Sequence, residues 1–326
     1  MKTFAFLLFI LAAFLPSCEV TTLESDTVAI GIDADPTNLD PRLATDANSS
    51  RIIGLLFSGL VRQDEKGLLR PDLAASWDME APTTYLFHLR RDVRFHDGTP
   101  LTSKDVKYTI ETILDPATAS PHRSTFEKIE RIETPDVHTV RFVLTEPFAP
   151  FLLAMTMGVV PREAALAAGD EFSITPVGSG PFRLTERRPG EIYRLKAYPH
   201  YFGGRPKLAQ VLFRVVPDNT VRFLEMRKGT LNLLINGIEL DYIPLVQKDP
   251  RLKLVTGPGV NYSYIGFNLL DPILRAQAVR EAISHAVDRE AVIQHLLKGT
   301  GQLATGLLSP LNWAYNNNVT TYRYDP

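Results

Sequence analysis

Residues 84–116 contain the sequence patterns of a strand, a tight turn and a capped helix in one short stretch of the chain. From Thr84 to Arg90 the apolar side chains alternate with others, which is the two-residue period of a strand. Asp97-Gly98 is a strong turn dipeptide. Thr102 and Asp105 then have the spacing of a helix capping box, and Asp115-Pro116 stops the helix. This stretch predicts a fold that mixes helices and strands.

The remaining patterns follow no regular alternation of strand and helix. The fold class is therefore α/β in the sense of mixed α+β, and not a simple doubly wound sheet. The length of 326 residues predicts about two domains. Further helices are predicted over residues 50–60, 219–228, 275–286 and 289–297. Further strands are predicted over residues 28–32, 93–95, 137–144, 180–185, 192–197, 211–216, 231–235 and 262–268.

The N-terminus has the pattern of a bacterial secretion signal. Residues 4–15 form an almost unbroken apolar run, which is too short to span a bilayer. Leu15-Pro16-Ser17-Cys18 follows and resembles a lipoprotein cleavage site, so residues 1–18 are predicted as a lipoprotein signal peptide with lipid on Cys18. Cys18 is the only cysteine and cannot form an intrachain disulfide. The alternative is an ordinary signal with an incidental cysteine.

Charge and motif content favour a protein that is neither an enzyme nor a nucleic-acid binder. The formal net charge of −2 provides no basic field. Gly178-Ser179-Gly180-Pro181 lacks the lysine and the helix of a phosphate loop, and we interpret it as a tight turn. His96-Asp97-Gly98 is interpreted as a hairpin turn with His96 at the surface, and His88 has no His or Cys at ligand spacing. No metal and no cofactor is predicted.

An ordered set of short motifs is the most specific clue to function. In chain order they are Asn38-Leu39-Asp40-Pro41, Pro71-Asp72-Leu73-Ala74, Tyr85 to Arg90, Val93 to Thr102, Gly178 to Phe182, Tyr201 to Gly204, Gly266 to Asn268 and Val279 to Arg289. Together they resemble the family 5 bacterial extracellular solute-binding proteins, the peptide, dipeptide, oligopeptide and nickel receptors of ABC importers. The resemblance runs from about Val28 to Pro326. Family members continue beyond the position that matches Pro326, so a C-terminally truncated receptor is expected.

The resemblance implies a two-lobed periplasmic binding protein-like fold with a ligand cleft between the lobes. Residues 19–54 and 172–267 would build the first lobe, and residues 55–171 a small domain inserted into it. Residues 268–326 would begin the second lobe and leave it incomplete. Closure of such lobes is a hinge motion that hides the solute from water.

The resemblance also indicates where ligand contacts would lie. In the oligopeptide receptors the loop after the Leu-Asp-Pro motif contacts the peptide, the loop after Ser120-Pro121 contributes an aromatic residue, and the strand at 261–264 forms a pocket wall. The predicted contacts are Thr45, Asp46, Ala47, His122, Asn261, Tyr262 and Tyr264. The alternative is that these residues only satisfy surface hydrogen bonds. The acidic partner of a peptide amino group would come from a later region of such receptors.

These patterns predict a receptor that binds di- or oligopeptides and delivers them to the permease subunits of an ABC importer. It would act in the periplasm or cell envelope, held to a membrane through Cys18, as a monomer without a cofactor. Within the family, nickel, haem or an oligosaccharide are the alternative solutes. Outside it, the alternatives are a non-functional truncated fragment and a secreted hydrolase, although no nucleophile–base pair stands out for the latter.

Overall fold

The computed structural model describes residues 26–235, 237–257, 259, 261–310, 312 and 314–326, and the predicted lipidation site Cys18 lies outside these ranges. The chain divides into two compact units, Met1–Gly237 and Ile238–Pro326. Both helices and strands are present, so the mixed α/β class is confirmed. Among the described residues, we find no helix with the length and apolar character needed to cross a bilayer.

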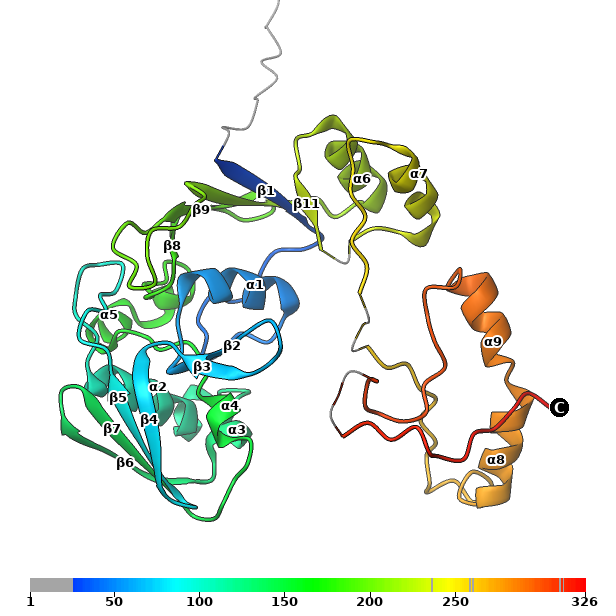
Figure 1. Ribbon diagram of the computed structural model, residues 1–326, viewed down its shortest axis with the longest axis horizontal. Helices are drawn as coiled ribbons and strands as arrows, with labels where there is room; N and C mark the ends of the chain where they lie inside the picture. Colours follow the sequence, from blue (N-terminus) through cyan, green and yellow to red (C-terminus); the bar gives the residue numbers. More distant parts are fainter. Residues whose placement is uncertain (1–25, 236, 258, 260, 311, 313) are drawn as a thin grey trace, which may run out of the picture. The chain divides into compact units, whose positions relative to one another are not determined.

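A five-stranded sheet in the order β11-β1-β10-β9-β8 lies in the first unit (Figure 1). Strand β1 is parallel to β10 and β11, whereas β9 is antiparallel to both β10 and β8. The bounds are β1 Thr27–Ile32, β8 Phe182–Arg188, β9 Ile192–Ala197, β10 Gln210–Val215 and β11 Leu233–Leu234. Each of these strands overlaps a predicted one, although β11 is much shorter than predicted.

Helices α1 (Ala47–Leu56) and α6 (Asn219–Lys228) cover opposite faces of this sheet. Ile30 of β1 packs in one buried cluster with apolar residues of α1. Gly31 faces the other way, because successive side chains of a strand point to opposite faces. A Cβ atom on Gly31 would lie 3.2 Å from Cγ of Arg222 in α6. The sheet is therefore covered on both sides at β1.

A four-stranded antiparallel sheet, β4-β5-β7-β6, is the second large sheet of the first unit (Figure 1). Its strands are β4 Ala74–Ala81, β5 Thr84–Leu89, β6 Ile129–Asp136 and β7 Thr139–Leu144. The alternation predicted for β5 is confirmed, since Tyr85, Phe87 and Leu89 are buried. The ring of Phe87 meets that of Phe142 edge-on, with 5.7 Å between centroids. Full burial of such a side chain stabilises the fold by about 1.5–3 kcal/mol.

Helix α2 (Ser103–Leu114) packs against this second sheet and begins at the predicted capping box. Oδ2 of Asp105 accepts hydrogen bonds from the backbone N–H and the hydroxyl of Thr102, both at 2.8 Å. Oδ1 of Asp105 accepts a third bond, 2.8 Å long, from the backbone N–H of Arg162. One carboxylate thus caps α2 and also ties it to the start of α5 (Arg162–Ala168).

Besides β11, a helix and a strand of the first unit differ from the sequence expectation. The helix predicted over 50–60 is α1, which begins earlier because Asp46 caps it and ends where Phe57 takes an extended backbone. The strand predicted over 93–95 is reduced to one bridge between Arg94 and Pro100, because the tight turn at Gly98 leaves no room for a longer ladder.

The shorter elements of the first unit are β2 Val61–Gln63, β3 Leu69–Pro71, α3 Arg123–Phe126 and α4 Phe151–Ala154, with 3-10 turns at Pro116–Thr118 and Gly169–Ser173.

The second unit contains short helices and extended segments. Its elements are α7 Ile243–Lys248, α8 Gln277–Ala286 and α9 Arg289–Ala291, with a 3-10 turn at Leu240–Tyr242 and a π-helical turn at Val292–Leu296. The predicted strand over 262–268 is wrong, because no strand is assigned there. A strand needs a neighbour for its backbone hydrogen bonds, and the described residues of this unit contain none.

The glycines of the Gly178-Ser179-Gly180 segment have a different role from the tight turn that we expected. A Cβ atom on Gly178 would lie 1.9 Å from the carbonyl oxygen of Leu56 at the end of α1. The backbone N–H of Gly180 donates to that same oxygen at 2.8 Å. Close approach of two backbones therefore requires glycine here, because any side chain would force them apart.

Candidate functional site

The carboxyl ends of β1 and β10 form the candidate ligand-binding edge of the first unit. The two strands are adjacent and parallel, with Ile32 opposite Val215 at their ends. The chain then passes from β1 to α1 on one face of the sheet and from β10 to α6 on the other face. Connections that diverge in this way open a crevice outside the strand ends, which is the usual place for ligands in open α/β sheets. We name residues 33–46 the β1 loop.

Asp46 ends the β1 loop and caps α1. Its carboxylate accepts hydrogen bonds from the backbone N–H of Ser49 at 2.8 Å and from the hydroxyl of Thr37 at 2.5 Å. Burial alone would raise the pKa of Asp46, but the hydrogen bonds from Ser49 and Thr37 outweigh it and lower the pKa to about 2. The side chain is therefore ionised, and it fixes the start of the helix.

His122 lies against the β1 loop, although it is far from that loop in the sequence. Its Nε2 is 2.8 Å from the carbonyl oxygen of Ala44, so this ring nitrogen carries a proton and donates it. The hydroxyl of Ser120 donates to the carbonyl of Arg42 at 2.6 Å. The structure thus brings His122 next to the segment that contains Thr45 and Asp46. Thr45 and Ala47 are exposed at this position.

A buried ion pair that the sequence reasoning missed stabilises the β1 loop. Asp40 and Arg42 are both buried and pair at 2.6 Å. The guanidinium carbon of Arg42 also lies 5.5 Å from the ring centroid of Tyr108 and 5.6 Å from that of Phe172. The Asn38-Leu39-Asp40-Pro41 motif is therefore an anchor of the loop. The available signal in the sequence was the spacing of Asp40 and Arg42, an acid two residues before an arginine.

A second buried arginine, on α6, binds backbone carbonyls at the same edge of the sheet. Arg222 is 2% exposed, and its Nη1 donates to the carbonyl oxygens of Val216 and, at 3.2 Å, Pro217. Its Nη2 donates to the carbonyl oxygen of Gly237 at 3.2 Å. These bonds join the end of β10 to the segment after β11. Sequence reasoning gave no role to Arg222, because it has only the pattern of a polar helical residue.

Asp33 is the carboxylate that the end of β1 presents to solvent. Its Oδ1 accepts a hydrogen bond of 3.0 Å from the side-chain amide of Asn48, which also donates to the carbonyl of Ala34 at 2.9 Å. The bond from Asn48 lowers the pKa of Asp33, with smaller contributions from Arg222 and Arg51. An exposed, ionised carboxylate on a fixed backbone can accept hydrogen bonds from a cationic group of a ligand.

The predicted contacts Asn261, Tyr262 and Tyr264 belong to the second unit. The rings of Tyr262 and Tyr264 stack on each other with 5.7 Å between centroids, and Tyr264 is 74% exposed. They lie on an extended segment and not on the strand that we expected. A ligand role for any of the seven predicted contacts stays a prediction.

Comparison with known proteins gives the family. Residues 69–326, more than half of the chain, match the bacterial extracellular solute-binding proteins of family 5, in the part described as the family 5 Middle. The chain belongs to this family. The dipeptide-binding protein of Escherichia coli is 29% identical over 94% of this chain and 62% of its own length. The oligopeptide-binding protein AppA of Bacillus subtilis is 29% identical over 98% of this chain and 62% of its length.

Solved structures of family 5 receptors show the same fold. NikZ of Campylobacter jejuni, in complex with Ni(L-His), superposes with a TM-score of 0.84 at 28% identity, over 93% of this chain and 61% of that one. AppA in complex with a nonapeptide gives 0.83 at 29% identity, over 92% of this chain and 61% of that one. The chain thus spans about three-fifths of the length of these relatives. The periplasmic binding protein-like fold and the family are both confirmed, and the proteins of this family are receptors and not enzymes.

Proposed function

We propose that this chain binds di- or oligopeptides at the carboxyl edge of β1 and β10 and presents them to the permease of an ABC importer. The observation that carries this proposal is the divergence of α1 and α6 from two adjacent parallel strands, because ligands of open α/β sheets usually bind outside such strand ends. Several relatives are named as peptide binders, among them the dipeptide-binding protein of Escherichia coli and DppA of Helicobacter pylori in complex with the peptide STSA.

The exposed groups of this edge suit a peptide. The exposed carboxylate of Asp33 can accept hydrogen bonds from N–H groups of a peptide, and the exposed residues Thr45 and Ala47 can contact it. In the predicted pocket wall at residues 261–264, the stacked rings of Tyr262 and Tyr264 could pack on apolar side chains of a peptide. No covalent step and no cofactor is needed, because differential binding to the closed form drives closure of the lobes.

The proposal includes the sequence-based location in the cell envelope. The apolar run at residues 4–15 and the cysteine at position 18 support export and lipidation. A diacylated cysteine would hold the receptor on a membrane, since each buried methylene contributes about 0.8 kcal/mol. Cys18→Ser should release the protein into the soluble fraction and abolish labelling by radioactive palmitate. Unchanged labelling in this variant would contradict lipidation at Cys18.

Titration of the full chain with a random tripeptide mixture tests the binding function. We expect saturable binding in calorimetry and a rise in the melting temperature, because a ligand that binds only the folded state stabilises it. Asp33→Asn should weaken binding by about tenfold or more, since a hydrogen bond to a charged group contributes about 1.5–3 kcal/mol. Asp78→Asn is the matched control, because Asp78 is an exposed aspartate of β4.

Three outcomes decide between the readings. Saturable tripeptide binding that Asp33→Asn weakens and Asp78→Asn does not weaken supports the proposal. Binding of Ni(II)–histidine, haem or an oligosaccharide without any response to tripeptides would move the chain to another solute class of the same family. A folded chain that responds to none of these probes would contradict a receptor function for this chain.

A further inference from the structure

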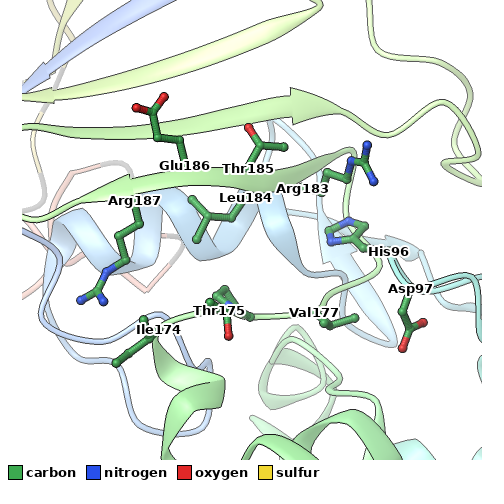
Figure 2. Close-up of a pocket in the computed structure, with 11 residues that line it drawn as sticks. His96, Asp97, Ile174, Thr175, Val177, Arg183, Leu184, Thr185, Glu186 and Arg187 are labelled. Carbon is green, nitrogen blue, oxygen red and sulfur yellow. The ribbon is translucent and has the colours of Figure 1, made fainter.

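A cavity of about 500 Å³ lies in the first unit between β8, the segment before it and the turn at residues 96–97 (Figure 2). It is distinct from the edge described above, because none of its lining residues belongs to the β1 loop or to α6. Its volume is within the usual range for small-molecule sites, about 300–1,000 Å³. Its walls mix apolar side chains, chiefly Ile174, Val177 and Leu184, with polar groups such as Thr175 and Arg187.

An irregularity in β8 turns an arginine toward this cavity. The pairing of β8 with β9 shifts between Leu184 and Glu186, so Leu184 pairs with Leu195 while Arg187 pairs with Tyr193. Both partners are buried, so Leu184 and Arg187 share the inner face. Figure 2 shows these two side chains on one side of β8 and Glu186 on the other. A regular strand would have placed Leu184 and Arg187 on opposite faces.

The guanidinium of Arg187 has no carboxylate partner among the residues that the structure describes. Its Nε is buried without any hydrogen-bond partner in that part of the chain. Two acids of the surrounding elements, Asp35 and Glu186, are engaged elsewhere. Asp35 accepts from the hydroxyl of Tyr193 and the backbone of Gly190, both at 2.8 Å, and Glu186 pairs with two arginines on the other side of β8.

From this geometry we propose that the cavity binds a small organic carboxylate through Arg187. Arg187 lines the cavity, and its planar guanidinium can match a carboxylate with two parallel hydrogen bonds. The apolar walls formed by Ile174, Val177 and Leu184 would contact the rest of the ligand. A singly charged carboxylate suits Arg187 better than a phosphate monoester, which carries a charge of about −1.5 to −2, because the acids Asp97 and Glu186 also line the cavity. Arg183, at the other end of the cavity, is exposed and contributes less because solvent screens it.

Phenylacetate is a suitable probe, because it joins one carboxylate to one apolar ring. Calorimetric titration of the full chain should show one saturable site for phenylacetate, and phenylacetamide and inorganic phosphate should bind at least tenfold more weakly. Arg187→Gln should weaken phenylacetate binding by about tenfold or more, as expected for loss of a charge-assisted pair. Arg188→Gln is the matched control, since Arg188 is the next residue of β8, exposed and outside the cavity. It should bind like the parent chain.

A second variant keeps the test decisive if Arg187→Gln does not fold. Leu184→Trp fills the cavity and leaves the arginine in place, and it should abolish phenylacetate binding while retaining the response to tripeptides. A tripeptide should not displace phenylacetate, so failure of this site and failure of the peptide site are distinguishable. Equal binding of acid and amide, or full binding by Leu184→Trp, would overturn the proposal.

Discussion

His96 should make the stability of the first unit depend on pH in a defined direction. Its Nε2–H donates to the carbonyl of Gly180 at 3.1 Å, and its Nδ1 accepts from the backbone N–H of Gly178 at 3.2 Å. A proton added to Nδ1 would face an N–H donor and remove that bond. Burial lowers the pKa of His96 to about 4 from the ordinary value of 6.5, and the bond to Gly180 opposes this shift only in part.

The sign and size of this pH effect follow from the difference in the pKa of His96 between the folded and unfolded states. Between pH 6.5 and 4 the unfolded chain binds a proton at His96 and the folded chain does not, so lower pH favours unfolding. The contribution of His96 is complete above pH 6.5 and falls by about 3 kcal/mol by pH 4, at 1.36 kcal/mol per pKa unit. Asp72 opposes this trend, because burial raises its pKa to about 6 and it takes up a proton in the folded state first.

Urea unfolding at pH 7.5, 6 and 5 measures this effect in the parent chain and in His96→Gln. Trp313→Phe in both proteins leaves Trp77 as the only tryptophan, so the fluorescence reports on the first unit. The parent should lose about 2 kcal/mol more than His96→Gln between pH 7.5 and 5, since the contribution of Asp72 is common to both. Equal pH dependence in the two proteins would refute the reasoning. His200→Gln, at an exposed histidine of the same unit, is the control and should follow the parent.

Three further substitutions test the packing that positions the site, with urea unfolding as the measurement. Gly178→Ala should destabilise the fold by about 3 kcal/mol, because its Cβ would overlap a backbone carbonyl of α1. Gly54→Ala is the control and should be neutral or stabilising, because the space around Gly54 is open. Equal effects of the two substitutions would contradict the close approach of the two backbones. Asp40→Asn should cost about 3–5 kcal/mol because it leaves Arg42 buried without its partner, and a loss below about 1 kcal/mol would contradict the anchoring role of this pair. Asp46→Ala should cost about 1 kcal/mol through loss of the helix cap, and no loss would mean that other groups start α1.

Local chemistry made several elements predictable from the sequence. The capping box of Thr102 and Asp105 and the start of α6 after Asp218 depend on side chains within three residues, so their spacing is visible in the sequence. The alternation in β5 was equally readable, because one face of that strand packs on a core. The family could be identified because its motifs keep their order over most of the chain.

Features that depend on distant contacts could not be predicted in the same way. His96 was expected at the surface, but Gly178 and Gly180 bond to both of its ring nitrogens and partly bury it. The strand expected over 262–268 was wrong because period and composition do not supply the partner that a strand needs. The direction of Arg187 depends on a pairing shift in β8 that a regular alternation does not reveal.

The central claim is that a peptide binds at the divergent ends of β1 and β10. Photo-crosslinking with a tripeptide that carries a central benzoylphenylalanine, followed by peptide mapping, tests it most directly. We expect saturable labelling within residues 33–47 or at His122, and unlabelled tripeptides should suppress it. Saturable labelling confined to the sheet β4-β5-β7-β6, or labelling that tripeptides do not suppress, would contradict it.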